Sequence, residues 1–213
     1  MKDELMTNWF MLPGMGASAA MYDALRRELS FKITFINWPE YHGETSYKEV
    51  AQRVINENRI SGGDIVGGSS LGGMVALEIA SSIEVRAAIL LGSAVNAKEV
   101  QGLLARLSPL AGITPISLVQ ALAGKHRNPV SSMFAEANPE FIRAMAMYLP
   151  SWAGYDGLQE KVFRLHGKKD HIIPCPPSGC DVLEGAGHLL AITRASETAM
   201  FLEKIRTHLR WTQ

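Results

Sequence analysis

Cysteine, long apolar runs and an excess of either charge are all lacking in this chain of 213 residues. Two cysteines are too few for a disulfide framework, so we expect a protein of the reducing cytosol. The sequence contains no run of about 18 apolar residues, the length needed to span a bilayer. Residues 1–6 carry both charges, unlike a signal peptide. The 21 basic residues balance 21 acidic ones, so we expect neither nucleic acid nor a membrane as a partner. What remains is a globular, enzyme-sized chain with 47% apolar residues.

Short apolar runs alternate with helical patterns over much of the chain. The runs predict strands at residues 9–12, 33–36, 64–66, 87–91, 162–165 and, more weakly, 180–183. Such near-continuous apolar runs suit strands that are buried on both faces of a parallel sheet. An amphipathic stripe at residues 46–59 predicts a helix, with Ser46 and Glu49 as a capping box at its start. The predicted fold class is therefore α/β, a three-layer sandwich with a mainly parallel sheet.

The alternation breaks in residues 94–157, which contain five prolines and no convincing strand. The segment is too long for a plain loop. We interpret it as a helical cap inserted after the fourth strand, over the edge of the sheet where ligands bind in such folds. The predicted domains are a core at residues 1–93 and 158–213 and a cap at 94–157.

A glycine-rich motif, Gly68-Ser69-Ser70-Leu71-Gly72, follows the third predicted strand and precedes a helical run. This is G-x-S-x-G, in which a serine on a tight strand-to-helix turn is exposed and small flanking residues permit close packing. Ser70 is the candidate nucleophile, and the N–H of Leu71 is a candidate donor to an oxyanion. A plain glycine-rich turn is the alternative. A phosphate-binding loop is disfavoured because no lysine follows the glycines.

A nucleophilic serine needs a base, and the base needs an orienting acid. His188 is the preferred base because it ends a small-residue loop, 184–188, after the last predicted strand. Asp170 is the preferred acid because it follows the fifth strand and gives the chain order Ser, Asp, His. The alternative acids are Asp156 and Asp181. The alternative bases are His42, His126, His166, His171 and His208.

Four motifs in this order resemble the α/β-hydrolase superfamily over nearly the whole chain outside the cap. They are Pro13-Gly14-Met15-Gly16, Gly68-Ser69-Ser70-Leu71-Gly72, His166-Gly167-Lys168-Lys169-Asp170 and Gly185-Ala186-Gly187-His188. The resemblance implies a triad of Ser70, Asp170 and His188, with Met15 supplying the second oxyanion N–H. The chain departs from the family in its missing first strands, in Pro13 where a histidine is usual, and in its short interval between acid and base. We therefore expect a minimal core of roughly six parallel strands in the order 2-1-3-4-5-6.

The inserted segment is rich in apolar side chains, some of which we expect to line a pocket near Ser70. The candidates are Met133, Phe134, Met145, Tyr148 and Trp152. An apolar wall suits an uncharged ester or thioester better than a sugar or phosphate. A basic cluster at Lys125-His126-Arg127 makes an acyl carrier protein a candidate partner, although a solvated face is the simpler interpretation. The cap is similar to that of pimeloyl-carrier-protein methyl ester esterases and related small carboxylesterases.

The predicted function is that of a serine hydrolase acting on a small, largely apolar carboxylic ester or thioester through an acyl-enzyme. The alternatives are a lyase on the same fold and a receptor that keeps the pocket to sense a small ligand. We expect no cofactor and no metal site. Cys175 and Cys180 are expected to be free thiols in a compact turn, since a metal site needs more ligands.

Overall fold

The computed structural model describes residues 7–100 and 129–211, and its parallel sheet confirms the predicted α/β class. Six strands lie in the order β2-β1-β3-β4-β5-β6, as predicted, and every neighbouring pair is parallel. The strands are β1 (Trp9–Leu12), β2 (Thr34–Phe35), β3 (Ile65–Ser69), β4 (Ala87–Leu91), β5 (Val162–Gly167) and β6 (Asp181–Leu183).

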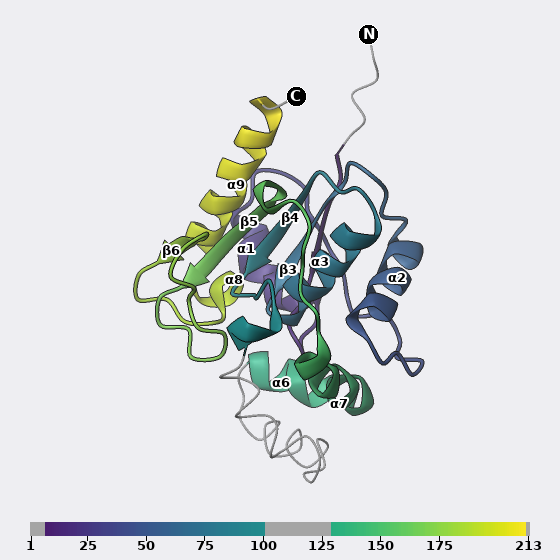
Figure 1. Ribbon diagram of the computed structural model, residues 1–213. Helices are drawn as coiled ribbons and strands as arrows, with labels where there is room; N and C mark the ends of the chain where they lie inside the picture. The colour runs from purple at the N-terminus through teal and green to yellow at the C-terminus, as the bar shows by residue number, and fades with distance from the viewer. Residues whose placement is uncertain (1–6, 101–128, 212–213) are drawn as a thin grey trace.

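Helices cover both faces of this sheet (Figure 1). The α-helices are α1 (Asp23–Glu28), α2 (Tyr47–Asn58), α3 (Leu71–Ser82), α6 (Pro129–Glu136), α7 (Pro139–Tyr148), α8 (Leu190–Thr193) and α9 (Ala195–Trp211). Short 3-10 helices are η1 (Ala19–Tyr22), η2 (Ala97–Val100), η3 (Leu149–Ser151) and η4 (Gln159–Lys161). None of the helices within the described ranges combines the length and apolar content needed to cross a membrane.

The core divides into two apolar clusters because successive side chains of a strand point to opposite faces. In β4, Ala88 and Leu90 pack with α2 and α3, whereas Ala87, Ile89 and Leu91 pack with α1, α8 and α9. All five residues are buried. This central strand therefore carries an unbroken apolar run, which is why its bounds match the prediction.

The amino end of α2 is capped as the sequence predicts. Ser46 Oγ accepts a hydrogen bond from the N–H of Glu49 at 3.2 Å. The Glu49 carboxylate accepts from the N–H of Thr45 at 2.7 Å. The Ser46 cap therefore agrees with the prediction, whereas the reciprocal bond goes to the residue before Ser46 and not to Ser46 itself, as a capping box would have it.

Between β4 and β5, the described residues form helices and no strand. Helices α6 and α7 lie beyond the carboxyl end of the sheet (Figure 1). Phe134 and Ile142, one from each helix, approach Gly16, which follows β1. The division into core and cap stays a prediction, and the basic cluster at 125–127 lies outside the described residues.

Candidate active site

Ser70 stands at the junction of β3 and α3 in a strained conformation. It follows the last residue of β3 and precedes Leu71, the first residue of α3. Its φ of 54° and ψ of −120° lie in a backbone region that residues other than glycine rarely adopt. This is the sharp strand-to-helix turn that exposes a nucleophile at the carboxyl edge of a sheet.

The glycines around Ser70 are needed because neighbouring backbone leaves no room for side chains. A Cβ at Gly72 would lie 2.4 Å from the carbonyl oxygens of Leu12 and Pro13. A Cβ at Gly68 would lie 2.4 Å from the carbonyl carbon of Gly72. The turn is thus pressed against the segment that follows β1, and the G-x-S-x-G spacing reflects this close approach.

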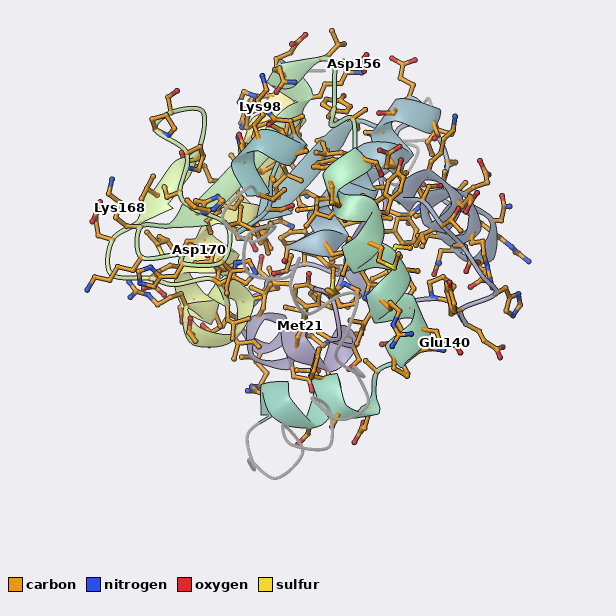
Figure 2. The ribbon with its side chains drawn as sticks, turned by 60° about the horizontal axis from the view of Figure 1, so that its bottom comes forward. Met21, Lys98, Glu140, Asp156, Lys168 and Asp170 are labelled. Carbon is orange, nitrogen blue, oxygen red and sulfur yellow. The ribbon has the colours of Figure 1, made fainter. Side chains whose placement is uncertain are left out.

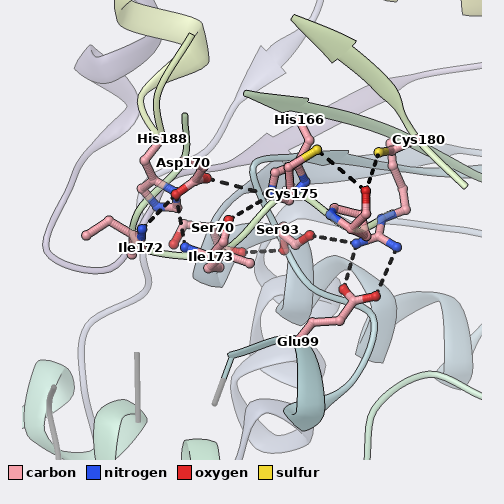
Figure 3. A network of polar contacts seen from close by, with 12 residues as sticks. Ser70, Ser93, Glu99, His166, Asp170, Ile172, Ile173, Cys175, Cys180 and His188 are labelled. Carbon is pink, nitrogen blue, oxygen red and sulfur yellow. Dashed lines mark hydrogen bonds and ion pairs between the residues drawn. The ribbon is translucent and has the colours of Figure 1, made fainter. Parts of the chain in front are cut away.

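Asp170 and His188 form a buried hydrogen-bonded pair (Figure 3). The distance from His188 Nδ1 to Asp170 Oδ2 is 2.7 Å. Oδ1 of Asp170 accepts from the N–H groups of Ile172 and Ile173 at 2.8 and 3.0 Å. The carboxylate is fully buried, whereas 14% of the His188 side chain is exposed. The acid is therefore fixed on both oxygens, and it holds one nitrogen of the imidazole.

The electrostatic environment keeps Asp170 ionised. Burial alone would raise the pKa of its carboxyl group, but the hydrogen bonds from His188, Ile172 and Ile173 outweigh this effect. The net result is a pKa below the ordinary value for aspartate. An ionised acceptor favours the imidazole tautomer that carries its proton on Nδ1, which leaves Nε2 able to accept a proton.

Ser70 and His188 meet at the end of β4. The N–H of Ser70 donates to the carbonyl of Leu91 at 3.1 Å. A Cβ on the next residue, Gly92, would lie 3.5 Å from His188 Nδ1 and 3.4 Å from Asp170 Oδ2. Within the described residues the Ser70 hydroxyl makes no direct hydrogen bond to His188, which is common in active sites without substrate. All three side chains thus gather at one point of the sheet edge (Figure 3).

Two backbone N–H groups near Ser70, those of Met15 and Leu71, are predicted as oxyanion donors. Across the described part of the chain, no partner accepts from the N–H of Met15 or that of Leu71. Leu71 is the first residue of α3, so the helix offers its N–H no acceptor. Met15 follows Gly14, where a Cβ would lie 3.7 Å from Ser70 Cβ. Both residues therefore lie close to Ser70 in the structure, and the role of their N–H groups as oxyanion donors stays a prediction.

Comparisons with known proteins agree with this architecture. A family model described as alpha/beta hydrolase family matches residues 10–200. This chain belongs to the alpha/beta hydrolase family. A sequence search of curated proteins gives no significant match.

Solved structures share the fold of this alpha/beta hydrolase at low sequence identity. A thermophilic esterase from Thermogutta terrifontis is 17% identical, with a TM-score of 0.71 over 95% of this chain and 90% of the esterase. A hydrolase from Oleispira antarctica is 13% identical, with a TM-score of 0.71 over 93% and 90% of the two chains. An N-acyl homoserine lactonase with bound N-butanoyl homoserine is 17% identical, with a TM-score of 0.70 over 95% and 89%.

The alternative acids and bases lie apart from Ser70 or serve other contacts. Asp156 projects at the periphery, away from Asp170 (Figure 2). Asp181 pairs with Lys204 at 2.9 Å on an exposed surface. The side chain of His42 is 63% exposed. Of the remaining histidines, His126 lies outside the described residues, His171 is exposed and His208 contacts the ring of Phe163.

The predicted pocket residues fall into two groups. Phe134 lies against Gly16, beside the loop that carries the Met15 N–H. Met133, also half-buried, packs against the cluster on the α1 and α9 side of the sheet. Met145, Tyr148 and Trp152 instead surround Tyr47 of α2. Met145 and Trp152 are 0% and 2% exposed, so these two side chains pack the interior.

His166 is a second histidine beside Asp170, but its surroundings suit a structural role. Its Nε2 donates to the carbonyl of Ile173 at 2.9 Å and lies 3.6 Å from Asp170 Oδ2. The ring is fully buried, and Nδ1 has no partner among the described residues. Burial lowers the pKa of His166, so it stays neutral and supports the turn that holds Asp170.

Sequence reasoning missed a buried polar network that contacts the turn at Ser70 through Ser93 (Figure 3). Ser93 Oγ donates to the carbonyl of Ser70 at 2.7 Å. The carbonyl of Ser93 accepts from Arg164 Nη2 at 3.2 Å, and this guanidinium pairs with Glu99 at 2.6 Å. No spacing in the sequence connects these residues, because their strands and loops become neighbours only in the sheet.

Cys175 and Cys180 are free thiols that point toward one carbonyl oxygen, that of Pro176, at 3.6 and 4.0 Å. Burial and the neighbouring Cys175 raise the pKa of Cys180 to about 11, so its thiol stays protonated. In the described part of the chain no group of three or more His, Cys, Asp or Glu side chains could hold a metal ion.

Proposed function

We propose that this alpha/beta hydrolase is a serine hydrolase that cleaves a small carboxylic ester or thioester through an acyl-enzyme. The observation that carries the proposal is the strained turn of Ser70 beside a histidine that a buried carboxylate holds at 2.7 Å. This observation supports the assignment of Ser70 as nucleophile, His188 as base and Asp170 as acid. The names of the esterase and the lactonase with the same fold indicate action on ester bonds, which agrees with this proposal.

In the proposed mechanism, Ser70 Oγ attacks the substrate carbonyl while His188 Nε2 accepts the hydroxyl proton. The imidazolium that forms is stabilised by Asp170, to which Nδ1–H already donates. The N–H groups of Met15 and Leu71 bind the oxyanion of the tetrahedral intermediate. His188 then passes the proton to the leaving alcohol or thiol. In the second half-reaction it activates water, which hydrolyses the acyl-enzyme and regenerates Ser70.

A hollow of about 330 Å³ lies beside the loop that carries the Met15 N–H, although Ser70, Asp170 and His188 do not line it. In this proposal it receives the apolar part of the substrate. It is bounded by residues 16–18, 37–41, 137–138 and 141, and Trp38, Tyr41 and Phe141 supply aromatic walls. This volume lies at the lower end of the range for small-molecule sites, about 300–1,000 Å³. A carrier-protein partner and a cytosolic location stay predictions from the sequence.

The test is turnover of p-nitrophenyl butyrate by the wild type, by Ser70→Ala and by a matched control, Ser81→Ala. Ser81 is exposed near the far end of α3, where its hydroxyl bonds the carbonyl of Leu77. Ser70→Ala should lose turnover and labelling by a fluorophosphonate probe while it keeps the wild-type melting temperature, and Ser81→Ala should keep both. Retained turnover by Ser70→Ala would refute the assignment. Ligand binding by the wild type without turnover or labelling would favour the receptor alternative.

A further inference from the structure

We infer that Trp38 and Ser93 are positioning residues that aim the two oxyanion donors, an inference that rests on the proposed function. Each side chain donates a hydrogen bond to a backbone carbonyl beside Ser70. Each of these carbonyls belongs to the same peptide group as one of the proposed donors, the N–H of Met15 or of Leu71.

The first of these peptide groups joins Gly14 to Met15. Trp38 Nε1 donates to the carbonyl of Gly14 at 3.0 Å from a position 24 residues away in the chain. The described residues contain no cis peptide bond, and in a trans peptide the C=O and N–H lie in one plane and point in opposite directions. A bond that fixes the carbonyl therefore fixes the direction of the Met15 N–H. The indole itself is held against the ring of Phe141, with centroids 5.2 Å apart.

The second peptide group joins Ser70 to Leu71. Ser93 Oγ donates to the carbonyl of Ser70 at 2.7 Å from 23 residues away. Ser93 is fully buried, and its own carbonyl accepts from Arg164, which is paired with Glu99. The hydroxyl is thus fixed by a network that extends from β5 to η2 (Figure 3). The same planar geometry lets it set the direction of the Leu71 N–H.

Both carbonyls also accept a local hydrogen bond, but the local bonds cannot align the two peptides with each other. The carbonyl of Gly14 accepts from Ala17 at 3.1 Å, and that of Ser70 accepts from Gly73 at 3.0 Å and from Met74 at 3.4 Å. The first bond closes a turn in the loop after β1, and the other two belong to the first turn of α3. The long-range bonds instead tie the first peptide to the segment after β2 and the second to the segment after β4. A donor on each carbonyl also polarises the peptide, which strengthens the N–H as a donor on its other side.

The expected kinetic effect follows from when the oxyanion exists. Its charge develops only toward the tetrahedral intermediate, so misdirected donors should lower kcat while KM changes little. Loss of a whole oxyanion donor costs about 10²–10³-fold in kcat. A donor that stays present but is misaligned should cost less, about tenfold for each variant. The two effects should multiply to about 100-fold in the double variant if the peptides respond independently.

The experiment compares Trp38→Phe, Ser93→Ala and their double variant with two matched controls. Trp9→Phe shortens a buried indole at the start of β1, which packs on Phe31 away from the site. Ser81→Ala removes an equivalent hydroxyl-to-carbonyl bond from α3. The readouts are kcat and KM for p-nitrophenyl butyrate, inhibition by a trifluoromethyl ketone, whose serine adduct carries an oxyanion, and thermal melting.

We expect kcat and inhibitor affinity to fall together by about tenfold in Trp38→Phe and in Ser93→Ala, with both controls at wild-type values. KM should stay within about twofold in Ser93→Ala, whereas Trp38→Phe is judged by kcat and inhibitor affinity, because Trp38 also lines the hollow. Wild-type kcat in both variants, or a loss of kcat with unchanged inhibitor affinity, overturns the inference and leaves the proposed function intact. A loss matched by the controls, or one that only follows a lower melting temperature, also overturns it. A wild type that neither turns over esters nor takes the fluorophosphonate probe removes the proposed function and the inference together.

Discussion

Replacing Asp170 by asparagine tests how the acid sets the tautomer of the histidine. Oδ1 of Asp170 accepts from the N–H groups of Ile172 and Ile173, and Oδ2 accepts from Nδ1 of His188. An asparagine offers only one carbonyl oxygen, and two backbone donors require it at the Oδ1 position. Its NH₂ group then faces His188, whose Nδ1 must become an acceptor. The imidazole proton therefore moves to Nε2, where it blocks proton transfer from Ser70.

The expected loss is large because the alternative orientation of the amide gives no rescue. Turning the NH₂ group toward Ile172 and Ile173 would leave both buried N–H groups unpaired, at about 1–3 kcal/mol each. The wrong tautomer of a catalytic histidine typically lowers kcat by about 10⁴-fold. This factor corresponds to about 5.4 kcal/mol in activation free energy. KM should change little, because neither group binds the substrate.

The assay is kcat for p-nitrophenyl butyrate, with thermal melting to establish that the variant is folded. Asp181→Asn is the matched control, since this exposed aspartate pairs with Lys204 at the surface, 2.9 Å away. Asp170→Asn should retain about 10⁻⁴ of the wild-type kcat, and Asp181→Asn should retain all of it. An Asp170→Asn variant that keeps a tenth of the wild-type rate, or an equal loss in the control, would refute this account of the tautomer.

Two further predictions concern stability. Gly72→Ala places a Cβ 2.4 Å from the carbonyl oxygen of Leu12, so the melting temperature should fall by the equivalent of about 1–3 kcal/mol. Gly62→Ala, whose Cβ would have its nearest neighbour at 3.4 Å, should melt close to the wild type, and equal losses in the two variants would contradict the argument. Burial holds the pKa of His166 below its ordinary value of 6.5, so the unfolded chain takes up a proton before the native one as the pH falls. The contribution of His166 is thus complete above about pH 6.5 and is lost as the pH falls toward the native pKa. His166→Gln should flatten the decline of melting temperature in this window, and His42→Gln, an exposed site, should not; a slope unchanged by His166→Gln would show the reasoning to be wrong.

The sequence predicts a strand well where the whole strand is buried and therefore apolar. It predicts a strand less well where one close contact between two atoms decides which residue fits. The bounds of β4 match because both of its faces are buried, so every residue in it is apolar. The predicted third strand stops at residue 66, whereas β3 continues to Ser69. Glycine is scarce in strands, so Gly67 and Gly68 indicate a turn. Both glycines nevertheless continue the strand, because they pair with β4 in the sheet. Gly67 is needed there because a Cβ would lie 2.6 Å from the carbonyl oxygen of Ile89.

The sequence likewise predicts some residues of the candidate site and not others. Ser70 and His188 stand in short motifs whose small neighbours can be recognised along the chain. Trp38 and Ser93 have no such signature, because they act through carbonyls 24 and 23 positions away. Any donor that the sheet brought to these places could serve. A spacing rule cannot find a residue whose partner is a backbone atom that every residue possesses.

The two adjacent glycines after Leu71 illustrate how one motif contains two different constraints. The absence of a side chain at Gly72 leaves room for backbone atoms, the carbonyl oxygens of Leu12 and Pro13. The absence of a side chain at Gly73 leaves room for the side chain of Ser93, because a Cβ at Gly73 would lie 2.4 Å from Ser93 Oγ and 2.6 Å from Ser93 Cβ. The second glycine is therefore what allows the hydroxyl of Ser93 to reach the turn.

Two compensating substitutions, Gly73→Ala and Ser93→Gly, distinguish a packing role of Ser93 from a role in positioning the Ser70 carbonyl. Gly73→Ala alone should lower both the melting temperature, by the equivalent of about 1–3 kcal/mol, and kcat, since the new methyl group displaces the hydroxyl from the Ser70 carbonyl. Adding Ser93→Gly removes both clashing atoms, so the double variant should recover most of the melting temperature. It still lacks a donor for the Ser70 carbonyl, and its kcat should therefore stay about tenfold below the wild type. A double variant that recovers full turnover would show that Ser93 only fills space, and that the Leu71 N–H does not depend on a hydrogen bond from Ser93 to the Ser70 carbonyl.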